Sequence, residues 1–142
     1  MIGHRGHRNF RRMFACGLSV LFISVFVAPV SAHHSFAVHY DGDSTRTLDG
    51  TVENFRFRNP HGMILLKVET GGPDDGLWRI ETNSPNILRR RGWSPDSLRA
   101  GDSVTIVGFP ARDGSQSMRV FRVTFTDGTE LIGQRPAAGL ER

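Results

Sequence analysis

Apolar and polar residues alternate through residues 45–132, with breaks at glycine, proline and aspartate, and this pattern predicts short β-strands. The predicted strands cover residues 45–57, 63–70, 77–81, 103–109 and 117–126, and residues 129–132 are a candidate for a short sixth strand. In the first strand the alternation changes phase between Val52 and Phe55. Such a change inside one strand predicts a β-bulge or a sharp bend.

One short helix is predicted between the third and fourth strands. Ser84 suits the N-cap, Pro85 suits the first helical position, and Gly92 ends the pattern. Ile87 and Leu88 are expected to face the core. The run Arg89-Arg90-Arg91 falls in the last turn, where cations complement the helix dipole, although a binding patch is the alternative interpretation.

This order of elements favours one fold class. A long bent strand, two further strands, a helix and two more strands follow the chain order of the OB-fold, a five-stranded, partly open barrel. We therefore expect an all-β protein, with a small five-stranded OB-like barrel over residues 45–132 and the helix between strands 3 and 4. A β-sandwich is the alternative, but it usually needs more strands than the pattern offers.

Residues 1–32 have the organisation of a signal peptide. Arginines without acidic residues come first, an apolar run follows up to Val27, and small residues precede a cleavage point after Ala32. The run is shorter than the roughly 20 residues of a transmembrane helix, so an uncleaved anchor is the less favoured alternative and no membrane span is expected after cleavage. Arg11-Arg12 resembles part of a twin-arginine signal, which leaves the export route open. We expect a periplasmic or secreted protein with an N-terminal arm at 33–44 and a flexible tail at 133–142.

Removal of this segment changes how the net charge of +4 is interpreted. The chain has 18 Lys and Arg against 14 Asp and Glu, and four of the arginines lie before residue 13. The mature part is therefore near neutral, which argues against nucleic acid as a partner. Cys16, the single cysteine, also lies in the predicted signal peptide, so neither a disulfide nor thiolate chemistry is expected in the mature protein.

Four histidines remain in the mature part, namely His33, His34, His39 and His61. Cleavage after Ala32 would make His33 the first residue, and its amine and imidazole could then chelate one metal ion. A further imidazole would complete a three-nitrogen site that suits Cu(II). Cleavage after Ser31 would instead place a histidine third, which also suits Cu(II) or Ni(II). The alternative is that these histidines only form hydrogen bonds or occupy a tight turn.

A second group of candidates belongs to a ligand-binding face of the barrel. Phe57 and Trp78 are aromatic residues near the face that OB-folds use for ligands, although packing in the core or rim is the other interpretation. Asn59 lies in the Asn-Pro-His turn after the first strand. Glu81 ends the third strand and is expected either to support a histidine or to pair with Arg79, Arg89 or Arg90.

The mature sequence resembles an uncharacterised family of small exported proteobacterial proteins. The matching stretches are Ala32-His33-His34-Ser35-Phe36, Leu48-Asp49-Gly50-Thr51-Val52, Asn59-Pro60-His61, Asn83-Ser84-Pro85-Asn86 with Leu88, Arg91-Gly92-Trp93, Leu98 with Gly101-Asp102, and Asp127-Gly128. The resemblance implies an exported OB-like barrel and no known reaction. One departure is Gly62-Met63, where a larger apolar or aromatic residue would be expected.

These observations predict a non-catalytic exported binding protein. The first hypothesis is copper binding through His33 with His34, His39 or His61. The alternative is a metal-free OB module whose face recognises a protein, a peptide, a glycan or another small ligand. An enzyme would need paired catalytic groups, and the sequence does not reveal such a pair.

Overall fold

The computed structural model describes residues 34–134. The predicted signal peptide, His33 and most of the predicted tail lie outside the described residues. The elements are, in chain order, α1 (His34–His39), β1 (Arg46–Arg56), β2 (Met63–Val68), β3 (Gly76–Glu81), α2 (Pro85–Arg89), β4 (Ser103–Pro110), β5 (Ser117–Phe125) and β6 (Glu130–Ile132). No helix among them is long and apolar enough to cross a membrane.

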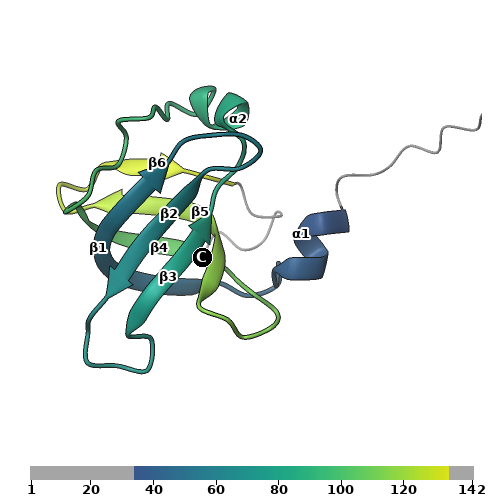
Figure 1. The fold of residues 1–142 in the computed structure, drawn as a ribbon, viewed down its shortest axis with the longest axis vertical. Helices are drawn as coiled ribbons and strands as arrows, with labels where there is room; N and C mark the ends of the chain where they lie inside the picture. Colours follow the sequence, from purple (N-terminus) through teal and green to yellow (C-terminus); the bar gives the residue numbers. More distant parts are fainter. Residues whose placement is uncertain (1–33, 135–142) are drawn as a thin grey trace, which may run out of the picture. The chain divides into compact units, whose positions relative to one another are not determined.

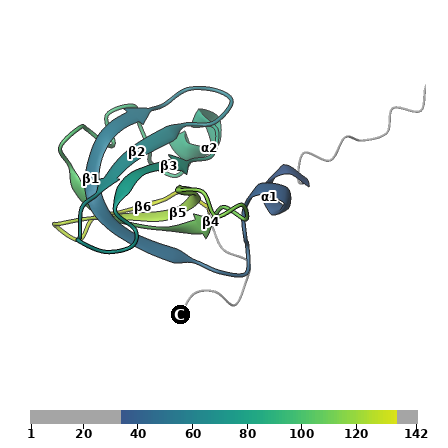
Figure 2. The ribbon, with the colours of Figure 1, turned by 60° about the horizontal axis from the view of Figure 1, so that its bottom comes forward.

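The strands form the predicted OB-like barrel (Figure 1). Their order is β3-β2-β1-β4-β5-β6, and a parallel pairing between β3 and β5 closes the barrel. The first strand pairs with β4 through its first half and with β2 through its second half. This double pairing requires β1 to curve strongly, as Figure 2 shows.

The predicted irregularity of β1 is confirmed. The register with β2 shifts between Val52 and Asn54, so the strand contains a bulge at the point where its apolar phase changes. Gly50 lies just before it, and an added Cβ there would collide with the carbonyl oxygen of Lys67. Glycine therefore permits the close approach of β1 and β2 at the bend.

The barrel interior is apolar and contains most of the residues predicted to face inward. Its centre includes Leu48, Val52, Ile64, Leu66, Val68, Trp78, Ile80, Leu88, Val104, Ile106, Met118, Val120 and Val123. Leu88 fixes α2 over one end of the barrel. The helix begins after Ser84 with Pro85 in its first turn, as predicted.

Two predictions of inward-facing residues are wrong. Ile87 is 39% exposed because the short helix turns only Leu88 and Pro85 inward. The alternation in residues 117–126 also predicts that Phe121, Val123 and Phe125 face inward, but Phe121 and Phe125 are only half-buried. A register shift between Val107 and Gly108 in the β4–β5 pairing moves the buried positions of β5 to Met118, Val120 and Val123.

The N-terminal arm contains a helix, α1, that the sequence pattern did not predict. Phe36 packs edge-on against Phe109, with ring centroids 5.5 Å apart. The backbone N–H of Asp41 donates to the carbonyl oxygen of Pro110 at 2.9 Å, and that of Arg112 donates to the carbonyl oxygen of His39 at 2.9 Å. These contacts hold the arm against the β4–β5 turn, beside the barrel (Figure 2).

Candidate functional site

A cavity of about 680 Å³ lies where the arm meets the barrel. We call it the arm cavity. The arm, the β1–β2 loop, the end of β3, α2 and β5 all contribute to its walls. Its lining residues are Phe36, His39, Tyr40, His61, Glu81, Asn83, Ile87, Arg91, Arg119 and Gln134.

The β3–β5 pairing, which closes the barrel, brings together a carboxylate and a guanidinium group. Glu81 and Arg119 are direct partners in the parallel β3–β5 register. Nη1 of Arg119 donates to Oε1 of Glu81 at 2.7 Å, and Nη2 donates to Oδ1 of Asn83 at 2.7 Å. The side chain of Arg119 is only 10% exposed, and that of Glu81 is 23% exposed. Burial lowers the pKa of Arg119, whereas the neighbouring Glu81 carboxylate raises it again.

The Asn-Pro-His turn carries His61 to this pair. Met63 opposes Glu81 in the β2–β3 register, so His61 lies just beyond the paired part of β2. The N–H of Thr82 donates to the carbonyl oxygen of Gly62 at 2.9 Å. An added Cβ at Gly62 would lie only 2.5 Å from Oγ1 of Thr82, so glycine permits the close approach of this loop to Thr82.

The contacts of His61 hold its imidazole ring at the Glu81–Arg119 pair. Its Nδ1 is in direct contact with Oε1 of Glu81, and Nη1 of Arg119 lies 2.8 Å from the same Nδ1. In the neutral tautomer that donates to the carboxylate, the imidazole proton is on Nδ1, and the contact with Nη1 of Arg119 is then one between two donors. The second nitrogen, Nε2, then keeps a lone pair. A carboxylate that orients a histidine in this way is the usual support of a metal-ligating imidazole.

Tyr40 connects the arm to the same carboxylate. Its hydroxyl donates to Oε2 of Glu81 at 2.6 Å, and the side chain is buried. Glu81 thus accepts hydrogen bonds from three elements of the fold, namely the arm, the β1–β2 loop and β5. Burial, followed by the hydrogen bond to Glu81, raises the pKa of Tyr40 to about 12.

The raised pKa of Tyr40 can be measured directly by titration. Tyr40 is the only tyrosine of the chain, so the ultraviolet absorbance of tyrosinate should rise with a midpoint near pH 12 in the folded protein. In denaturant the midpoint should return to about 10. Since the folded pKa is the higher one, the stabilisation from this proton is complete below pH 10 and disappears as the pH rises through 12. A folded-state midpoint near 10 would contradict the Tyr40–Glu81 contact.

Two of the four predicted metal ligands line the arm cavity. His39 and His61, which are 22 positions apart, line the same cavity. His34 begins α1, and His33 lies outside the described residues. Between residues 34 and 134 no group of three or more His, Cys, Asp or Glu side chains is arranged to hold a metal ion.

The predicted ligand-binding residues do not gather at one site. Trp78 is 2% exposed and belongs to the core, where its Nε1 donates to the carbonyl oxygen of Asp74 at 2.8 Å, so its ring offers no surface to a ligand. Phe57 is half-buried beneath the guanidinium group of Arg89. Asn59 is exposed in its turn. Only Glu81 lies in the arm cavity.

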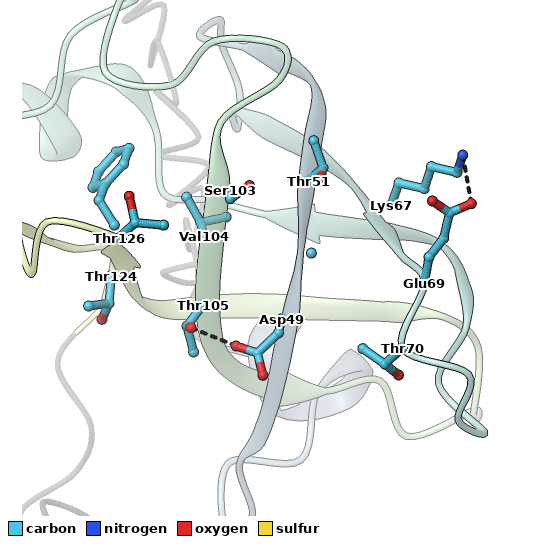
Figure 3. Close-up of a pocket in the computed structure, with 12 residues that line it drawn as sticks. Asp49, Thr51, Lys67, Glu69, Thr70, Ser103, Val104, Thr105, Thr124 and Thr126 are labelled. Carbon is cyan, nitrogen blue, oxygen red and sulfur yellow. Dashed lines mark hydrogen bonds and ion pairs between the residues drawn. The ribbon is translucent and has the colours of Figure 1, made fainter.

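A second hollow, of about 440 Å³, lies over β1, β2, β4 and β5 (Figure 3). Hydroxyl groups dominate it, and its charged side chains already have partners. Oγ1 of Thr105 donates to Oδ1 of Asp49 at 2.6 Å, and Nζ of Lys67 lies 2.7 Å from Oε1 of Glu69. This hollow contains neither an imidazole nor a buried charge, so the arm cavity is the stronger candidate site.

Sequence reasoning missed two members of the network. Tyr40 lay in an arm without periodicity, and its being the only tyrosine was a weak signal at most. Arg119 alternates with Met118 and Val120, a pattern that predicts an exposed position. The sequence also suggested Arg79, Arg89 or Arg90 as partners of Glu81, and this is wrong because the β3–β5 pairing places Arg119 there instead.

The comparisons with known proteins add a family and no activity. Searches of curated proteins and of solved structures found no match to this chain. A family model matches residues 21–119, which include β1 to β4, the Asn-Pro-His turn and Glu81. By this match the chain belongs to DUF6152, a family of unknown function.

Proposed function

We propose that this chain is an exported, non-catalytic binding protein and that its ligand is a copper ion held in the arm cavity. The proposed donors are the terminal amine and imidazole of His33, once the signal peptide is removed, and Nε2 of His61. Three nitrogen donors in this arrangement suit the tetragonal preference of Cu(II). His34 and His39 are candidates for a further donor.

The observation that carries the proposal is the contact between His61 and Glu81. Nδ1 of His61 contacts the Glu81 carboxylate, and Arg119 and Tyr40 hold that carboxylate in place. Such outer partners fix the orientation of a ligating imidazole and raise its basicity.

The anchoring of the arm supplies the second support. Tyr40 is tied to Glu81, and the side chain of Arg112 donates to the carbonyl oxygens of Ala37 and Tyr40 at 2.9 and 3.1 Å. The arm is therefore fixed at the cavity. The six-residue helix α1, which rises about 9 Å, connects the predicted mature N-terminus to Tyr40 at the cavity.

The test is a competition titration of the mature protein with Cu(II) and a chelator. The sample should begin at His33, as verified by mass spectrometry. We expect binding of one ion per chain, weakened at least about tenfold by His61→Ala and abolished by one extra residue before His33. Asn59→Ala, in the same turn but outside the cavity, is the matched control and should bind as the parent does. Affinity no greater than that of a synthetic peptide of residues 33–43 would overturn the proposal.

A further inference from the structure

Five arginines, of which one lines the arm cavity, have no acidic partner among the described residues. They are Arg56, Arg58, Arg89, Arg90 and Arg91, which we call the basic face. Within residues 34–134, no carboxylate oxygen lies within 4.0 Å of any of their guanidinium groups. On other parts of the barrel, Arg46, Arg112 and Arg122 each have a carboxylate at 3.2–3.5 Å. Arg79 and Arg99 also have no acidic partner among the described residues, but neither has another arginine close to it in the sequence.

The two segments that carry the basic face are neighbours in space. Figure 1 shows α2 beside the loop that joins β1 to β2. The guanidinium carbon of Arg89 lies 5.3 Å from the ring centroid of Phe57, between Arg56 and Arg58 in sequence. Nη1 of Arg91 donates to the carbonyl oxygen of Gly133, and Arg91 also lines the arm cavity. Two of the five arginines are thus held in place.

Local helix electrostatics do not account for this concentration of charge. The run Arg89-Arg90-Arg91 follows a helix of only five residues, whose dipole is small, and the dipole has no bearing on Arg56 or Arg58. Apart from these five arginines, residues 33–142 contain nine basic and fourteen acidic residues. Five cations without an acidic partner among the described residues, carried by two neighbouring segments, create a positive field there that favours an anionic partner.

The chemistry of the face selects among anionic partners. Arginine forms bidentate contacts with carboxylates, and it is enriched at protein interfaces. Ile87 precedes Arg89 by two residues, is 39% exposed and lines the arm cavity together with Phe36. A flat lipid surface or a sugar polyanion would leave this apolar concavity unused. We propose that the basic face binds an acidic polypeptide segment that carries one apolar side chain, seated against Ile87.

The test is an NMR titration of the ¹⁵N-labelled mature protein, without copper, with the end-capped peptide Glu-Glu-Leu-Glu-Glu up to about 1 mM. We expect shift changes confined to the β1–β2 loop and α2, and an affinity that falls as salt is raised. The double variants R56Q/R58Q and R89Q/R90Q should each weaken binding at least about fivefold. Arg79→Gln removes one unpaired cation on β3 and is the control for net charge.

Each outcome of this test bears on the basic face alone. Shift changes elsewhere on the barrel, equal weakening by Arg79→Gln, or the absence of binding would overturn the proposal. The same holds if vesicles containing phosphatidylglycerol, or heparin, bind this face while the peptide does not. Because copper is absent and no histidine is changed, failure here is independent of failure of the copper site.

Discussion

Replacing Glu81 by glutamine is expected to lower the free energy of unfolding by about 3 kcal/mol. The carboxylate is the only partner within 4.0 Å that neutralises Arg119 in the described part of the chain, and the arginine side chain is only 10% exposed. Glutamine keeps the shape but leaves this cation without a countercharge. It also offers an N–H group towards Tyr40, His61 or Arg119, which all donate to the carboxylate.

Urea denaturation followed by circular dichroism would measure this loss. Glu69→Gln is the matched control, because Glu69 also pairs with a cation, Lys67, but is 68% exposed. Its replacement should change the stability by no more than about 0.5 kcal/mol. If the two variants were equally stable, the network around Glu81 would not be a buried one.

The second large effect is expected at Trp78. Its replacement by alanine should cost about 3–5 kcal/mol, as truncation of a large core side chain usually does. The ring is packed in the centre of the barrel, and its Nε1 donates to the carbonyl oxygen of Asp74. Trp78→Phe should cost less, because it retains most of the apolar volume and removes mainly the hydrogen bond.

Thermal denaturation of the same variants separates packing from ligand recognition. Phe57→Ala should be milder than Trp78→Ala, because Phe57 is half-buried at the margin of the core. Loss of stability in Trp78→Ala follows from its placement in the core. A stable Trp78→Ala protein would contradict that placement and would restore the ring as a candidate for the ligand-binding face.

The barrel was predictable because its signals are local. The alternation of apolar residues located every strand, the phase change near Val52 indicated the bulge, and Ser84-Pro85 marked the start of α2. Where the pattern was misleading, a neighbouring irregularity was responsible. The register shift at Gly108 changed which residues of β5 are buried, and α2 proved too short to turn Ile87 inward.

The candidate site was only partly predictable, because its members meet through non-local pairings. His61 and Glu81 carry chemistry that a sequence can suggest, but their contact depends on how β2 and β3 are paired. Arg119 reaches Glu81 only through the strand pair that closes the barrel. Tyr40 reaches it because α1 and the β4–β5 turn hold the arm in place, and no periodic pattern encodes such a contact.

We propose that the barrel supplies an imidazole, that of His61, to a copper ion bound by the mature N-terminus. Electron paramagnetic resonance of the mature protein with less than one equivalent of Cu(II) tests it most directly, because nitrogen ligands split the copper signal. The account predicts splitting from three nitrogen donors in the parent protein and from two in His61→Ala. A spectrum unchanged by His61→Ala, and identical to that of a peptide of residues 33–43, would contradict it.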